Sequence, residues 1–68
     1  MENKTVKLPI LQYFTYEHLP EKLKEISHPC AVLALEMADK LPLGPELSAG
    51  LRKLLEAKDC FVRAKLQG

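Results

Sequence analysis

Apolar residues recur at intervals of three and four through the middle of the chain, a spacing typical of a helix with one apolar face. The first such stripe consists of Leu23, Ile26, Cys30, Leu33, Met37 and Leu41. Pro20 and Glu21 suit an opening turn, so the pattern predicts a helix of roughly 20 residues that begins there. Pro29 interrupts the backbone hydrogen bonds while the apolar phase continues, which predicts a kink, and Ser27 could cap a restarted helix.

A turn rich in proline and glycine, residues 41–46, separates this stripe from a second helical pattern that opens at Pro45 and Glu46. One row of the second pattern alternates small and large residues: Gly50, Leu54, Ala57, Phe61 and Ala64. A second apolar row contains Leu47, Leu51, Leu55, Val62 and Leu66. One partner helix cannot cover both rows, so we expect one to face the first helix and the other a neighbouring subunit. The predicted fold is all-α: an antiparallel helical hairpin over residues 20–68 that assembles into a helical oligomer.

Residues 1–19 are predicted to form an extended aromatic arm, because Pro9 opposes early helix formation and residues 11–16 have β-branched and aromatic character. Tyr13, Phe14 and Tyr16 are three of the four aromatic residues in the chain. Two interpretations stay open. Phe14 and its neighbours could cap the hydrophobic core, or Tyr16, together with Phe14, could present a ring face to a planar ligand.

A chain of 68 residues builds only a small core, and such chains usually need disulfides, a metal or oligomerisation. Cys30 and Cys60 lack the spacing of a zinc site, and the sequence shows neither a secretory signal nor a membrane span. We therefore expect a cytoplasmic protein that is stabilised by oligomerisation. Ten basic and nine acidic residues give a net charge of +1, which argues against DNA binding but permits a small anionic ligand.

No catalytic motif stands out, so an enzyme, a cofactor and a metal site are not expected. His18 and His28 are interpreted as solvated or capping residues. Arg52, Glu56, Asp59 and Arg63 lie four, three and four residues apart, on one side of the second helix. This row could be a solvated face with ion pairs, or part of a binding site. Lys58 falls within an apolar stripe, where a charge is costly unless it meets an anion or fixes a packing register.

Two segments carry a resemblance to a known family. Residues 51–64, LRKLLEAKDCFVRA, resemble the second helix of a phage helical-hairpin family, and the match continues through Glu46 after the loop at residues 41–45. Residues 14–20, FTYEHLP, resemble the entry to the first helix of that family. The family comprises the anti-CBASS and anti-Thoeris sponges, which neutralise the cyclic-nucleotide signals of bacterial anti-phage immunity. Together the matching segments touch about half of the chain.

The resemblance implies a homohexamer, built as a trimer of dimers, in the host cytoplasm during infection. It implies pockets for cyclic dinucleotides between two subunits and for cyclic trinucleotides at three-fold junctions, with the ligands sequestered and not cleaved. Tyr16 would stack on a base. Arg63, with Lys58 and Asp59 nearby, would face the junctions.

The chain departs from the family at Ser27-His28-Pro29, where relatives place basic or hydroxyl residues. Ser27 would keep a hydroxyl contact, and Lys24 would have to supply the basic contact to phosphate. The ligand class therefore stays open between the two kinds of cyclic nucleotide. The alternative functions are a small oligomeric protein–protein interaction module and a structural phage component.

Overall fold

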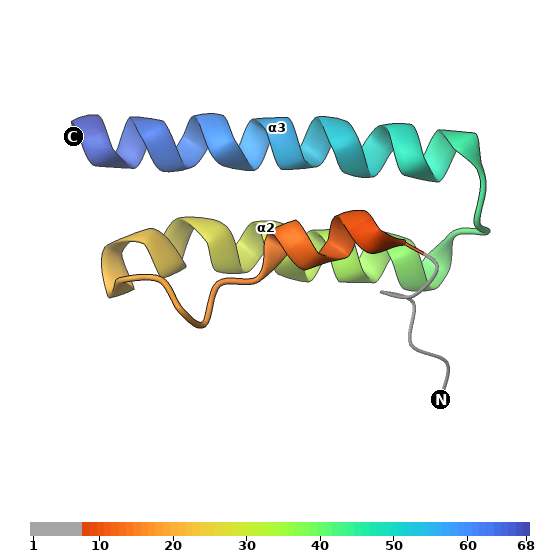
Figure 1. Cartoon of the computed structure of the whole chain (residues 1–68), viewed down its shortest axis with the longest axis horizontal. Helices are drawn as coiled ribbons and strands as arrows, with labels where there is room; N and C mark the ends of the chain where they lie inside the picture. The colour runs from red at the N-terminus through yellow and green to blue at the C-terminus, as the bar shows by residue number, and fades with distance from the viewer. Residues whose placement is uncertain (1–7) are drawn as a thin grey trace.

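The computed structural model describes residues 8–68, and the regular secondary structure of this part of the chain is entirely helical, without a strand. A short 3-10 helix, η1 (Pro9–Phe14), precedes two α-helices, α2 (Glu21–Lys40) and α3 (Pro45–Gln67). Figure 1 shows α2 and α3 side by side and running in opposite directions, while η1 packs against both of them. The predicted all-α class is confirmed. No helix in residues 8–68 is long and apolar enough to cross a membrane.

Proline sets the start of both long helices. Pro20 directly precedes α2, and Pro45 is the first residue of α3, where its missing N–H removes no helical hydrogen bond. At the other end of α2, the Leu41 N–H donates to the Met37 carbonyl oxygen at 3.0 Å. Pro29 lies inside α2, and the helix continues through it from Glu21 to Lys40.

The prediction of an extended arm over residues 1–19 is wrong for η1, while residues 1–7 lie outside the described part of the chain. Pro9 begins η1 because its fixed φ angle suits a first helical turn. A 3-10 helix has three residues per turn, so positions three apart share one side. Leu8, Leu11 and Phe14 have this spacing, and all three are buried. Packing of this three-residue stripe therefore overrides the strand-like composition.

The most deeply buried side of α2 consists of small residues, not of its leucines. Buried positions on α2 are Ser27, Cys30, Ala31, Ala34 and Ala38, with Ala34 fully inaccessible. Within the expected apolar stripe, Leu33 and Leu41 are 43% and 44% exposed. Alanines let η1 and α3 approach α2 closely, so the leucines are displaced towards an uncovered side.

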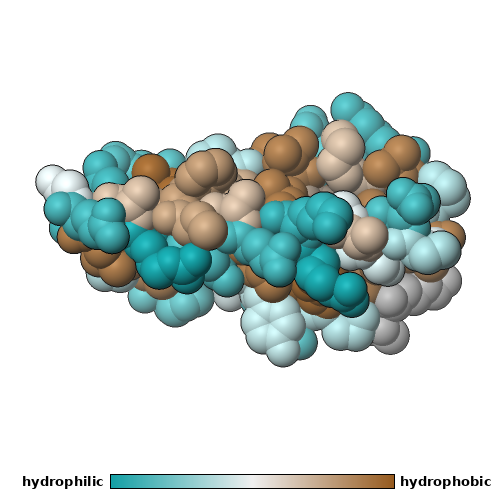
Figure 2. Space-filling view, turned by 90° about the horizontal axis from the view of Figure 1, so that it is seen from above, coloured by the Kyte–Doolittle hydropathy of each residue, from teal (hydrophilic) through white to brown (hydrophobic). Residues whose placement is uncertain are grey.

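The two apolar rows of α3 differ in burial. Leu47 and Leu51 of the second row are buried, whereas Gly50, Phe61 and Ala64 of the small-and-large row are exposed. An ion pair between Lys65 and Glu25 joins the C-terminal end of α3 to the beginning of α2. Figure 2, which looks down on the molecule from above, shows hydrophobic residues (brown) interspersed with hydrophilic ones (teal) along the length of the molecule. Much of the apolar pattern therefore lies at the surface of a single copy.

Candidate functional site

A polar hollow of about 550 Å³ lies where the segment after η1 meets the first turns of α2. Its lining residues are Tyr16, Glu21, Lys22, Lys24, Glu25 and His28. On α2, Lys24, Glu25 and His28 follow Glu21 by three, four and seven residues, so they lie with it on one side of the helix, and Lys22 is adjacent to Glu21. The hollow thus combines two aromatic rings with two ammonium and two carboxylate groups.

The backbone around Tyr16 is held by local hydrogen bonds. The Tyr16 carbonyl oxygen accepts from the Leu19 N–H at 3.0 Å, and the Tyr16 N–H donates to the Glu17 carboxylate at 3.3 Å. The pKa of Glu17 is lowered because its carboxylate accepts backbone hydrogen bonds from its own N–H and from that of Tyr16. Glu17 therefore supports this turn in its ionised form, which prevails at neutral pH.

The half-buried ring of Tyr16 lies against the imidazole of His28, with centroids 4.7 Å apart and planes inclined at 42°. This separation is within the range of favourable ring contacts. Tyr16 also packs against the hydrophobic core. His28 and the core therefore cover part of the Tyr16 ring, and a planar ligand would have to use the remaining part or displace the imidazole.

The charges in the hollow are only loosely held. The Lys24 Nζ lies 3.5 Å from the Glu21 carboxylate, and the Glu21 side chain is 92% exposed. Such an exposed ion pair contributes about 0–1 kcal/mol, so Lys24 can exchange Glu21 for another anion at little cost. Lys22 pairs with no carboxylate within residues 8–68. Glu25 is engaged by Lys65. The two lysines are therefore available to a phosphate group.

Two residues of the predicted site are buried. Phe14 is 3% exposed and belongs to the hydrophobic core, as the capping interpretation of the aromatic arm expected. Ser27 is 1% exposed, and its Oγ has no hydrogen-bond partner within the described residues. Of the predicted binding residues, the hollow therefore unites only Tyr16 and Lys24.

Lys58, Asp59 and Arg63 lie on α3, which contributes no residue to the hollow. Lys58 is half-buried and forms an ion pair with Asp59 at 3.0 Å. Burial raises the pKa of the Cys30 thiol, and the charge of Lys58 acts in the opposite direction, so Lys58 lies near α2. Arg63 is exposed, with its Nη2 3.2 Å from the Cys60 sulfur. Within residues 8–68 no ion pair joins two members of the row of Arg52, Glu56, Asp59 and Arg63.

Replacement of Ser27 by alanine is expected to raise the free energy of unfolding by about 1–2 kcal/mol. The substitution removes a buried hydroxyl that lacks a partner and improves helix propensity. Urea denaturation followed by circular dichroism measures the change. Ser48→Ala, at a half-buried position in the first turn of α3, is the matched control, expected to change stability by only a few tenths of a kcal/mol. A less stable Ser27→Ala protein would show that the hydroxyl makes a favourable hydrogen bond.

The sequence interpretation missed four residues of the hollow: Glu21, Lys22, Glu25 and His28. Glu21 was interpreted only as part of a helix start, and His28 was assigned to solvent or to a cap. A usable signal existed, because His28 follows Lys24 by four residues and therefore shares its side of α2. No group of three or more histidine, cysteine or acidic side chains in residues 8–68 is placed to hold a metal ion. Comparison with protein-family models, curated proteins and solved structures found no match to this chain.

Proposed function

We propose that this protein binds and sequesters cyclic oligonucleotide second messengers of bacterial anti-phage defence without cleaving them. The observation that carries the proposal is the hollow that the contacting rings of Tyr16 and His28 line together with Lys22 and Lys24. An aromatic face suits a nucleobase, and ammonium groups suit a phosphodiester. The resemblance of residues 14–20 and 51–64 to phage sponge proteins supports the same assignment.

In this proposal Tyr16 stacks on a base through the part of its ring that His28 and the core do not cover. Lys24 leaves Glu21 to bind a phosphate, and Lys22 adds a second positive charge at the rim of the hollow. Phe14 supports the site from the core and does not touch the ligand. Arg63, exposed on α3, serves a separate site for a cyclic trinucleotide at a junction between subunits.

The proposed assembly is a homohexamer, a trimer of dimers built from kinked helical hairpins, in the cytoplasm of the infected host. The exposed apolar side chains of a chain this small favour oligomerisation, because they leave a single copy with an incomplete core. A protein that neutralises a signal by binding also gains from several sites in one particle, since total binding capacity determines how much signal is removed.

A panel of cyclic di- and trinucleotides added to the protein during thermal unfolding tests the proposal. A ligand present at 100 times its dissociation constant stabilises the folded state by about 2.7 kcal/mol, which raises the unfolding temperature of a domain of this size by about 10–20 °C. Linear dinucleotides of the same bases are the control and should give a smaller shift. An unchanged unfolding temperature with every cyclic nucleotide would contradict the proposal.

A second candidate function is a protein–protein interaction module, and the apolar hollows between α2 and α3 favour it. An exposed apolar surface of this kind often marks a protein interface. This candidate predicts no thermal shift with cyclic nucleotides, so the same experiment separates the two functions.

A further inference from the structure

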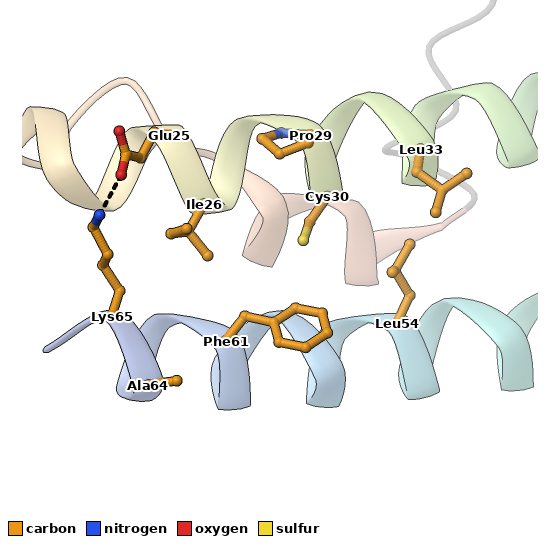
Figure 3. A pocket seen from close by; sticks show the side chains of 9 residues that line it. All are labelled: Glu25, Ile26, Pro29, Cys30, Leu33, Leu54, Phe61, Ala64 and Lys65. Atoms are coloured by element: carbon orange, nitrogen blue, oxygen red, sulfur yellow. Dashed lines mark ion pairs between the residues drawn. The ribbon is translucent and has the colours of Figure 1, made fainter. Parts of the chain in front are cut away.

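An apolar groove runs between α2 and α3. It consists of two adjoining hollows of about 610 Å³ and 440 Å³ that share Leu33 and Leu54. Figure 3 shows the larger hollow, with Ile26, Cys30 and Phe61 directed into the space between the helices and η1 behind it. Phe61 is 56% exposed. The groove is thus an apolar surface that no segment of residues 8–68 covers.

The side of α3 that lines this groove has a sequence suited to pairing with its own copy in reverse. Residues on this side of α3 form pairs whose two members are the same number of positions from the midpoint between Leu55 and Glu56. In each pair a large residue is matched by a small one, or an acidic residue by a basic one. The corresponding pairs of groove residues are Glu46 with Lys65, Leu47 with Ala64, and Gly50 with Phe61. The groove residue Leu54 corresponds to Ala57, which does not itself line either hollow. Ala57 completes the three-and-four spacing between the groove residues Leu54 and Phe61.

We infer that a second copy of the chain covers the groove. The two α3 helices then run antiparallel, related by a two-fold axis that passes beside Leu55 and Glu56. The inference rests on the oligomer in the proposed function. In a two-fold interface each contact occurs twice, so a surface must be complementary to itself. Phe61 of each copy then lies over Gly50 of the other, and Glu46 meets Lys65 at both ends. Lys65 forms an ion pair with Glu25 of its own chain, so in the dimer its ammonium group is shared between Glu25 and the Glu46 of the other copy.

Two structural facts support a second copy as the occupant. A Cβ atom at Gly50 would meet nothing within 4 Å, so a single copy provides no packing reason for glycine inside this helix. A ring from a second copy supplies that reason. Phe61, eleven residues further along the same groove, is 56% exposed, so each copy offers both an uncovered ring and an open position that can receive one.

Cysteine cross-linking tests both the occupant and the register. Gly50→Cys and Phe61→Cys are introduced, singly and together, into a protein with Cys30→Ala and Cys60→Ala. The two positions are eleven residues apart, roughly 16 Å along a helix, too far for a disulfide within one chain. Mild oxidation should convert most of the double variant to a covalent dimer on a non-reducing gel. Each single variant should stay monomeric on the gel, and an equal mixture of the two single variants should again give dimer.

A parallel or differently registered pair would cross-link a single variant to itself, or would leave the double variant uncross-linked, and either result overturns the inference. A second pair of variants does not depend on oxidation. Gly50→Ala should keep the oligomer mass measured by light scattering, whereas Gly50→Leu should reduce it while circular dichroism shows an intact helical protomer. An unchanged mass for Gly50→Leu would also overturn the inference.

The cross-linking result is independent of any ligand. A protein that binds cyclic nucleotides but does not form the Gly50–Phe61 cross-link loses this interface and keeps the proposed function. A protein that cross-links in this register but binds no cyclic nucleotide keeps the interface and loses the proposed function.

Discussion

Replacement of Phe14 by alanine is expected to lower the free energy of unfolding by about 3–5 kcal/mol, the usual effect of removing a buried aromatic side chain. Phe14 is 3% exposed and anchors η1 in the core formed with α2 and α3. A domain of this size is stabilised by only about 3–10 kcal/mol in total, so the variant should be largely unfolded or should release η1 from the other helices. Urea denaturation monitored by circular dichroism measures the loss.

The adjacent residue provides the matched control for this prediction. Tyr13 has a similar ring in the same 3-10 helix, but it is 59% exposed. Tyr13→Ala should therefore change the free energy of unfolding by no more than about 0.5 kcal/mol. Equal losses from the two substitutions would contradict the three-residue stripe through which η1 packs.

The second prediction concerns the ligand. Tyr16→Ala is expected to weaken cyclic-dinucleotide binding by about 1–3 kcal/mol, the range found for stacking of bases on aromatic side chains. Tyr16→Phe should bind almost as tightly as the unaltered protein, because the ring face makes the proposed contact and the hydroxyl does not. Isothermal titration calorimetry with a cyclic dinucleotide measures both variants, at a temperature where each is shown to be folded.

Tyr13→Ala again serves as the control, because Tyr13 is an aromatic residue of the same segment that does not line the hollow. It should leave the affinity unchanged. If Tyr16→Ala binds cyclic dinucleotides as tightly as the unaltered protein does, Tyr16 is not the stacking residue. If Tyr16→Phe loses as much affinity as Tyr16→Ala, the contact runs through the hydroxyl.

The long helices could be predicted from the sequence because strong local signals mark their ends. Pro20, Pro45 and the turn before Pro45 constrain the backbone whatever packs around them. The 3-10 helix could not be separated from an extended arm by composition alone. Its burial depends on the spacing of Leu8, Leu11 and Phe14, a pattern that matters only once α2 and α3 provide a surface to pack on.

The buried side of α2 illustrates a second limit. Hydrophobic periodicity gives most weight to large side chains, so Leu33 and Leu41 dominated the prediction. The structure buries Ala34 and Ala38 and leaves those leucines beside the groove. Small residues carry a weak hydrophobic signal although they set how closely helices approach. The leucine stripe therefore marks an uncovered surface of this chain more clearly than its interior.

Only part of the candidate site could be predicted from residue types. Tyr16 was chosen for its aromatic ring, and Lys24 because the family resemblance calls for a basic contact on the first helix; both line one hollow. Whether Phe14 and Ser27 are accessible depends on the packing of η1 against α2, which local sequence does not determine. The same packing brings His28 against Tyr16, a contact across twelve positions of the chain.

The most direct test of the central claim is to identify what the protein holds and releases. The purified protein is incubated with a mixture of cyclic di- and trinucleotides, separated from unbound ligand by gel filtration and denatured by heat, and the released compounds are identified by mass spectrometry. The account predicts that at least one cyclic nucleotide is retained through filtration and released intact, and that Tyr16→Ala retains less of a bound cyclic dinucleotide. Release of linear or cleaved nucleotides, or retention of none from the mixture, would contradict it.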